Sequence, residues 1–464
     1  MLNVELKRIK KKYLRIKILS FFAVLFLFAV VAMIIPLRPS VSAVEKRDLA
    51  KFPEFSMETF INGEYFAAID TWYADTFPFR DVFLRGNTLV SSLNGIQTVK
   101  IKGELTNVDE IPDFENRIDE EDETFANESE EDVEVAETTP ANESDNKVEE
   151  FVPEVVDEVE DAPIEVATQK LGPVFIAGDS VYEYYGFNQA SSDGYVNVIN
   201  NITERLAGKA TVYDIIVPNS MDITLNDSIR KSLATSNQND AINYMYSKMS
   251  KNVKVVPIYK TLREHKKEYV YFRTDHHWTA LGAYYAYEKF AKVKGIKAAS
   301  LDDFEMVAYD GFLGSFYAES GQLPALAANP DTVYGYIPKS TNSMKFVDKN
   351  GNEIAWNIVY DVSGWNSSTK YNAFIGGDNP LSIIENPDIN DGSSCVVIKE
   401  SYGNAFVPFL VANYQTIYVV DYRYYNEPLY NFIINNGIKD VIFINNVVAT
   451  GTPARIENLE HLTR

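Results

Sequence analysis

Two adjacent histidines are the clearest candidates for chemistry in this chain. Residues 271–280 read YFRTDHHWTA, and His276 and His277 are two of only four histidines among 464 residues. Asp275, two positions before His277, could hold one imidazole nitrogen while the other nitrogen takes a proton from a hydroxyl group. The same side chains could instead belong to a metal site, or could only tie a turn and cap the helix that follows.

A catalytic histidine of this kind needs a nucleophile, and two serines compete for the role. Ser180 lies in VFIAGDSVYEYYGF and Ser401 in CVVIKESYGNAFVPFLVANY. The residues after Ser401 are apolar and helical in pattern, which would place its hydroxyl near free N–H groups and the positive end of a helix. That position exposes a nucleophile and stabilises an oxyanion. The residues after Ser180 are aromatic and rich in turn formers, which predicts a hairpin, so we favour Ser401.

The metal interpretation is less favoured by the residue pattern. Adjacent histidines rarely direct their ligand atoms at one ion, and Asp275, His276 and His277 would need a further ligand from a distant carboxylate. We therefore expect neither a metal nor another cofactor.

Three more residues are further site candidates. Asn379, in the turn GGDNP, could donate to an oxyanion, and Tyr402 directly follows Ser401. Arg423, in DYRYY, could hold a carboxylate or a phosphate with two hydrogen bonds, although an ion pair with Asp421 is the simpler expectation.

The sequence from residue 169 onward alternates strands with helices. Residues 212–218 and 253–258 are short β-branched runs, and residues 279–295 have helical spacing that stops at Gly295. Residues 395–446 continue as strand, helix, strand, helix and strand. This alternation predicts an α/β fold with a mostly parallel sheet flanked by helices.

Two further segments complete the expected main domain, 169–464. Residues 301–394 are rich in Gly, Asn and aromatic residues and are predicted to form a loop-rich β insertion. EYVYFR, residues 268–273, is a candidate strand that would lead to His276 and His277, with Thr279 as the N-cap of the next helix. Sheets of this type bind ligands at the carboxyl ends of their strands, which places the two histidines at the surface.

The net charge of −23 comes from one segment. Residues 108–163 hold 24 acidic residues and only two basic ones, so the rest of the chain, with 42 acidic and 41 basic residues, is nearly neutral. Such a composition cannot bury enough apolar surface to fold, and we expect residues 104–168 to be a disordered linker. The parts expected to fold contain no cluster of basic residues, which argues against nucleic-acid binding. With only one cysteine, Cys395, the chain cannot form an internal disulfide.

The N-terminus has the pattern of a membrane anchor. Residues 18–36 contain an uncharged stretch of 18 residues, and seven Lys or Arg precede it between Lys7 and Lys17. The length suits a bilayer-spanning helix, and the basic residues 1–17 would stay in the cytoplasm. A cleaved signal peptide, with VSA at residues 41–43 as its cleavage site, is the alternative. Between anchor and linker, residues 44–103 predict two amphipathic helices that pack on the main domain.

Several motifs together resemble a known family. RTDHHWTALGAY is similar to the signature of the DHHW protein family, and KESYGNAFVPFL and VVDYRYY resemble its other blocks. More distantly, EKRDLAKFPEF, DTFPFRD and the Ser401 block resemble the SGNH-like domain of the alginate O-acetylation proteins. The resemblance implies an SGNH-hydrolase-like fold with a Ser-His-Asp triad whose order along the chain is reversed from that of ordinary SGNH hydrolases. In this triad Asp275 would orient the imidazole of His277, His277 would be the base and Ser401 the nucleophile. His276 and the sequence Lys399-Glu400 before Ser401 depart from the pattern of those proteins.

These inferences predict a membrane-anchored, extracellular acyl-transfer enzyme. The expected substrate is a cell-envelope polysaccharide, and the reaction is O-acetyl transfer or O-acetyl ester hydrolysis. The resemblance also implies a membrane O-acyltransferase partner that delivers the acyl group. The alternative is a module of the same fold that binds polysaccharide or scaffolds a partner without catalysis.

Overall fold

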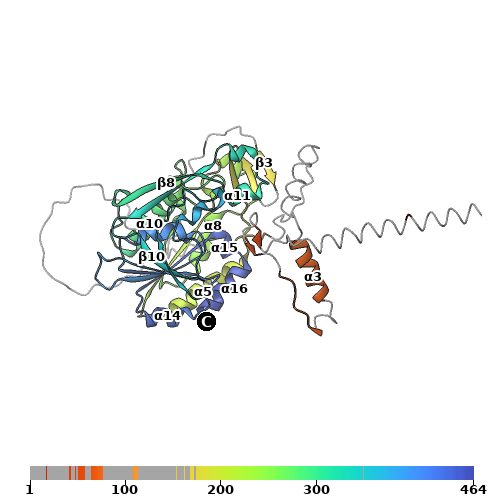
Figure 1. Ribbon diagram of the computed structural model, residues 1–464. Coiled ribbons are helices and arrows are strands. Elements are labelled where there is room, and N and C mark those ends of the chain that lie inside the picture. Colours follow the sequence, from red (N-terminus) through yellow and green to blue (C-terminus); the bar gives the residue numbers. More distant parts are fainter. Residues whose placement is uncertain are drawn as a thin grey trace, which may run out of the picture. The chain divides into compact units, whose positions relative to one another are not determined.

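The computed structural model describes most of the chain after residue 168 (Figure 1). It covers residues 168–171, 174–348 and 350–464, with shorter pieces at 17, 41–42, 47–48, 51–57, 64–76, 108–112, 153 and 161. The expected membrane anchor, the second amphipathic helix of residues 44–103 and nearly all of the acidic linker lie outside these residues. None of the helices in the described part is long and apolar enough to cross a membrane.

The first of two structural units, residues 1–99, contains one described helix. This helix, α3 (Glu64–Asp75), lies where the aromatic spacing predicts one, and two short strands, β1 (Val41–Ser42) and β2 (Arg47–Asp48), pair before it. Phe52 contacts Trp72 of the helix edge to face, with ring centroids 4.8 Å apart.

The second unit, residues 100–464, is built around an eight-stranded sheet in the order β11-β10-β12-β14-β13-β15-β6-β7. The five strands from β14 to β7 are parallel neighbours, whereas β12, β10 and β11 join antiparallel. Every residue of β13 and β15 is buried, as expected for central strands covered on both faces. The strands are β6 (Thr211–Val217), β7 (Val253–Val255), β10 (Ser343–Val347), β11 (Glu353–Asn357), β12 (Leu381–Glu385), β13 (Ser394–Lys399), β14 (Thr416–Asp421) and β15 (Asp440–Asn446).

Helices cover both faces of this sheet (Figure 1). On one side α10 packs against α13 and α9, and on the other α16 packs against α5 and α14. The longer helices are α5 (Gln189–Arg205), α8 (Gln238–Ser247), α10 (Ala280–Lys294), α13 (Gly403–Leu410), α14 (Leu429–Asn435) and α16 (Pro453–Thr463). The remaining helices, which are shorter or of the 3-10 type, are α6 (Ser220–Ile223), α7 (Asp227–Arg230), α9 (Tyr259–Glu264), η1 (Leu301–Asp303), α11 (Ser315–Glu319), α12 (Pro324–Ala327), η2 (Ser367–Ala373) and α15 (Val447–Thr450).

The predicted helix over residues 279–295 is confirmed as α10, including both ends. The Thr279 hydroxyl accepts a hydrogen bond from the Gly282 amide, which makes Thr279 the N-cap. Gly295 ends the helix with φ of 77°, a conformation that glycine adopts without steric cost.

The prediction of an α/β fold is confirmed, but the sheet is mixed. The insertion at residues 301–394 contributes β10, β11 and β12 to the main sheet, and these strands make its antiparallel side. Only β8 (Phe304–Phe312) and β9 (Asp331–Pro338) of the insertion form a separate two-stranded sheet.

The prediction that EYVYFR forms a strand was wrong. Residues 268–273 make a single β-bridge, Tyr271 to Trp278, because the chain turns back on itself between them. The next amides, those of Arg273 and Thr274, donate to the Asp331 carboxylate instead of to a neighbouring strand. Apolar alternation alone could not reveal that distant acceptor.

The hairpin predicted for the residues after Ser180 is confirmed only in part, because its turn lies before Ser180 and the residues after Glu183 lead into helix α5, which begins at Gln189. Strands β4 (Val174–Ala177) and β5 (Ser180–Glu183) pair antiparallel, and β3 (Thr168–Leu171) extends them into a three-stranded sheet. Gly178, with φ of 62°, lies in the turn directly before Asp179 and Ser180. The Ser180 hydroxyl donates to Asp179, at 3.2 Å.

A buried carboxyl in the sheet should make stability depend on pH. Asp214 lies in the middle of β6, accepts a hydrogen bond from the Tyr195 hydroxyl at 2.5 Å, and has a second oxygen without a partner in the described structure. Burial raises the pKa of Asp214 to about 7. Because the unfolded chain releases this proton near pH 4, ionisation in the folded state costs stability progressively between about pH 4 and 7.

We expect Asp214→Asn to stabilise the protein above pH 7 by up to about 4 kcal/mol, since the amide never ionises and can still accept from Tyr195. Urea unfolding at pH 5 and pH 8 would measure this difference. A variant that loses equal stability at both pH values would contradict the expectation.

Candidate active site

The histidine pair lies on a tight loop held by the backbone. The Phe272 amide donates to the His277 carbonyl at 3.3 Å, and the Thr279 amide donates to the Val270 carbonyl at 2.9 Å. These two hydrogen bonds close the loop, and α10 begins directly after it.

The fully buried Asp331 fixes the tip of this loop. Its carboxylate accepts hydrogen bonds from the Thr274 amide at 2.7 Å, the Thr274 hydroxyl at 2.6 Å and the Arg273 amide at 3.1 Å. No local pattern in the sequence singles out Asp331, which follows Thr274 by 57 residues and starts a strand of its own. Only the three-dimensional structure shows that Asp331 contacts this loop.

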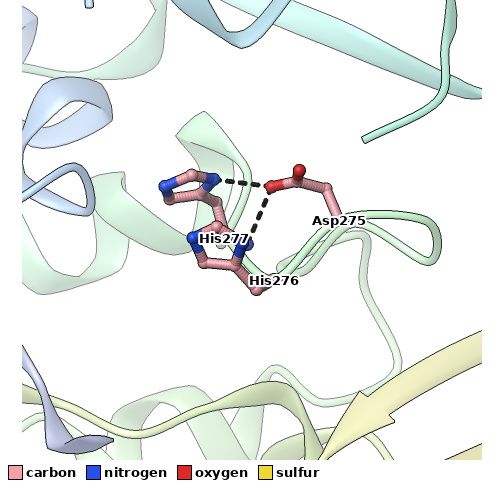
Figure 2. A group of neighbouring side chains, drawn as sticks. All are labelled: Asp275, His276 and His277. Carbon is pink, nitrogen blue, oxygen red and sulfur yellow. Dashed lines mark hydrogen bonds and ion pairs between the residues drawn. The ribbon is translucent and has the colours of Figure 1, made fainter. Parts of the chain in front are cut away.

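Asp275 uses both carboxylate oxygens to position the site. One oxygen, Oδ1, accepts from His277 Nδ1 at 2.5 Å and from the His277 amide at 3.0 Å. The other accepts from the Ser315 amide at 2.7 Å. Figure 2 shows the carboxylate of Asp275 pointing toward the imidazole rings. Because Nδ1 carries the proton that Asp275 accepts, Nε2 of a neutral His277 is left as an acceptor.

Ser401 supplies that donor from the opposite side of the site. It lies in the turn between β13 and α13, at the carboxyl end of a central parallel strand, and its Oγ is 2.7 Å from His277 Nε2. The structure therefore brings Asp275, His277 and Ser401 into one hydrogen-bonded line, although 124 residues separate the histidine from the serine.

Aromatic side chains hold the histidine ring in place. Tyr371 stacks on His277 with ring centroids 3.8 Å apart, and its hydroxyl donates to the Ser401 carbonyl at 3.0 Å. Burial, together with the Asp275 and Glu400 carboxylates, raises the pKa of Tyr371 well above its usual value, so the hydroxyl stays protonated. Trp278 donates through Nε1 to the Tyr402 carbonyl at 2.9 Å, which joins the histidine loop to the serine turn.

Comparison with known proteins places the chain in a family. The family model described as DHHW protein matches residues 45–420, a span that contains both the histidine loop and Ser401. The chain belongs to the DHHW family. The four residues for which the family is named are Asp275, His276, His277 and Trp278. A search of curated proteins found no match.

Solved structures of similar fold include another DHHW protein. The crystal structure of a DHHW family protein from Eubacterium siraeum is 27% identical, covers 65% of this chain and 100% of its own, and superposes with a TM-score of 0.60. PatB1 of Bacillus cereus, solved with a sulfonyl adduct, is 18% identical, covers 63% of this chain and 100% of its own, and has a TM-score of 0.53. The O-acetyltransferase domain of Pseudomonas putida AlgJ matches at 12% identity over 62% of this chain and 96% of its own, with a TM-score of 0.34.

In this DHHW protein a buried charge network lies beneath the turn that carries Ser401. The Lys399 ammonium, fully buried, contacts Asp421 at 2.9 Å and Asp378 at 3.0 Å. Arg423 contacts the same two carboxylates, at 2.6 Å and 2.8 Å. Burial alone would lower the pKa of Lys399, but the two carboxylates outweigh it and the pKa lies above its usual value. Two cations and two carboxylates therefore compensate one another at the end of β13.

The remaining candidates lie outside the line of Asp275, His277 and Ser401. His276 is turned toward the Ser315 hydroxyl, 2.6 Å from Nδ1. Asn379 directs its amide to carbonyls of its own turn, those of Ile375 and Gly376, and Ser180 bonds to Asp179.

Two other candidates have structural partners. Arg423 is paired with Asp421, the simpler of the two expectations, through two hydrogen bonds of 2.8 Å and 2.6 Å. Tyr402 is buried, and its hydroxyl donates to the His276 carbonyl.

The same group of residues has the composition of a metal site. Ligand atoms of Asp275, His276 and His277 lie within 4.8 Å of one another. Both ring nitrogens of His277 already have partners, Asp275 and Ser401, so a metal would have to displace one of them.

Gly314 allows the close approach of Asp275. A Cβ atom at this position would lie 2.0 Å from Asp275 Oδ2, well inside van der Waals contact.

We expect Gly314→Ala to displace the carboxylate and to destabilise the protein by about 1–3 kcal/mol through overpacking. Gly364→Ala is the matched control because nothing lies within 4 Å of its Cβ position, and it should change stability by less than about 0.5 kcal/mol. Urea unfolding of both variants would reveal the difference, and equal stabilities would refute this account of Gly314.

Proposed function

We propose that this protein is a membrane-anchored, extracytoplasmic acyl-transfer enzyme with an SGNH-hydrolase-like domain. The observation that carries the proposal is the line of hydrogen bonds from Asp275 through His277 to Ser401. A carboxylate, an imidazole and a hydroxyl in this order activate the hydroxyl as a nucleophile toward an acyl carbonyl.

The proposed reaction has two halves. In the first, Ser401 Oγ attacks the acyl carbonyl, its proton moves to His277 Nε2, and His277 then returns that proton to the leaving group. This produces an acyl-enzyme. In the second, His277 activates water or a hydroxyl of the acceptor, which takes the acyl group from Ser401. Asp275 keeps Nδ1 protonated and stabilises the imidazolium that forms in each half.

The turn that carries Ser401 suits the stabilisation of an oxyanion. Ser401 lies two residues before α13, and its own amide N–H has no hydrogen-bond acceptor among the described residues. A backbone N–H at the positive end of a helix is a suitable donor to the negative oxygen of a tetrahedral intermediate. The amide of Asn379 is occupied by its own turn and is not needed in this proposal.

The proposed setting of the enzyme follows from the sequence patterns. The basic residues 1–17 and the apolar residues 18–36 would anchor the chain with its main domain outside the cell. The substrate would be a cell-envelope polysaccharide, and the reaction either O-acetyl transfer or O-acetyl ester hydrolysis. For transfer, a membrane O-acyltransferase would supply the acyl group.

Hydrolysis of p-nitrophenyl acetate by the full-length protein in detergent tests the proposed chemistry. We expect Ser401→Ala and His277→Gln each to lower turnover by about 10³-fold or more, because each removes a member of one catalytic unit. Ser180→Ala is the matched control and should retain wild-type turnover, since Ser180 lies in the β4–β5 hairpin. A sulfonyl fluoride should add to Ser401 in wild type but not in Ser401→Ala, as judged by intact-mass spectrometry.

Other outcomes would redirect the proposal. A folded wild-type protein without turnover or adduct would favour the non-catalytic polysaccharide-binding or scaffolding module. Turnover that disappears with a chelator would favour a metal held by Asp275, His276 and His277.

A further inference from the structure

The motif VVDYRYY, which no step of the proposed reaction uses, follows the strand beside Ser401. β13 and β14 are parallel neighbours, and Lys399 pairs with Asp421 at their carboxyl ends. Because adjacent parallel strands lie about 5 Å apart, Ser401 and Arg423, each two residues beyond that pair, emerge at the same edge of the sheet. Tyr424 follows Arg423 directly. Ligands of α/β sheets bind at this edge, so Tyr424 lies where a substrate of Ser401 would approach.

Tyr424 is unusual in this domain because its side chain is exposed. It is 50% exposed, whereas Tyr422, two positions earlier, is 2% exposed. Tyr425 is half-buried and packs against Phe432. Among the described residues after 168, the other exposed aromatic side chain is Tyr334, which lies within the β8–β9 sheet. Packing within the domain therefore does not account for Tyr424, and a ligand that covers its ring would gain by removing apolar surface from water.

Backbone hydrogen bonds fix the turn that carries Tyr424. The amides of Tyr424 and Tyr425 both donate to the Asp421 carbonyl at 3.0 Å, and the Arg423 amide donates to the Asp421 carboxylate at 3.1 Å. The tyrosine backbone is therefore positioned before any ligand binds. A tyrosine side chain has only two torsions to order, so binding against its ring costs little conformational entropy.

Charged groups lie beside the ring of Tyr424. The Arg423 guanidinium is 5.4 Å from the centre of the ring. Its Nη2 contacts Asp378 Oδ2 at 2.8 Å and Asp421 Oδ2 at 2.6 Å. Asp421 is fully buried, whereas the side chain of Asp378 is 30% exposed. A carboxylate has about four acceptor positions, so Asp378 can accept from a ligand hydroxyl in addition to its protein partners.

We infer that Tyr424 is a sugar-stacking residue beside Ser401, with Asp378 and Arg423 as hydrogen-bonding partners of the same sugar. A pyranose ring presents a face of C–H groups, which packs on the negative face of an aromatic ring, and hydroxyl groups at its rim, which bond well to charged side chains. A fixed carboxylate beside the ring suits a ligand rich in hydroxyl groups better than the surface of an anionic membrane. The inference rests on the proposed function in one respect, the polysaccharide substrate.

Binding to an array of purified bacterial envelope polysaccharides tests this inference without turnover. The full-length protein in detergent would carry Ser401→Ala, so that no ester is cleaved during the measurement. We expect this parent to bind at least one polysaccharide and Tyr424→Ala, added to it, to weaken that binding by about tenfold. Tyr424→Phe should retain the binding, because stacking does not need the hydroxyl. Tyr334→Ala is the matched control, since it removes an exposed tyrosine from another part of the domain.

Three outcomes would overturn the inference. They are a folded parent that binds no polysaccharide on the array, unchanged binding in Tyr424→Ala, and an equal loss in Tyr334→Ala. Acetate release from the O-acetylated form of the bound polysaccharide gives a second readout in protein with Ser401 intact. We expect Tyr424→Ala to raise KM by about tenfold and to change kcat by less than about twofold, because the stacked sugar lies away from the reacting ester.

The two measurements separate this inference from the proposed catalysis. If wild type lacks esterase activity but the array responds to Tyr424→Ala as expected, the catalytic proposal fails and Tyr424 remains a sugar-binding residue. If wild type hydrolyses p-nitrophenyl acetate through Ser401 but Tyr424→Ala binds every polysaccharide as its parent does, the inference about Tyr424 fails and the catalytic proposal stands.

Discussion

The buried carboxylate of Asp331 is the constraint on which the candidate site depends. It satisfies the amides of Arg273 and Thr274, which would otherwise be left without acceptors because this segment belongs to no strand. By fixing the backbone of the loop, the Asp331 carboxylate orients Asp275 and His277 toward Ser401. The Tyr269 hydroxyl also donates to Asp331, at 2.6 Å, so the start and the tip of the loop share one anchor.

The Ser401 side of the site is organised by charge in a similar way. Lys399 and Arg423 are compensated by Asp378 and Asp421 directly beneath the turn, so the end of β13 can be buried without an uncompensated charge. Glu400 then links that turn to the end of β15. The two halves of the site are joined by Trp278 and Tyr371, which donate to carbonyls of the serine turn. Buried polar contacts around the site therefore fix the relative positions of its side chains.

Sequence reasoning recovered the local features that depend on neighbouring residues. The helix after Thr279, the strand–turn–helix around Ser401 and the hairpin around Ser180 all follow from short apolar runs, caps and turn formers. It failed at residues 268–273, where the apolar spacing of a strand is present but the hydrogen-bond partner is a side chain far along the chain. It also did not predict that β10, β11 and β12 extend the main sheet, because pairing across an insertion leaves no local pattern.

The sequence by itself determined the residue types of the site and the family to which the chain belongs. An aspartate two positions before a histidine and a serine at the end of an apolar strand are local facts, and they were enough to single out Asp275, His277 and Ser401. Only the tertiary structure decided that these three meet, that His276 contacts Ser315, and that Glu400 lies within hydrogen-bond distance of Ser401. The reason is physical: a hydrogen bond depends on distances of a few tenths of an ångström, which the packing of distant segments sets.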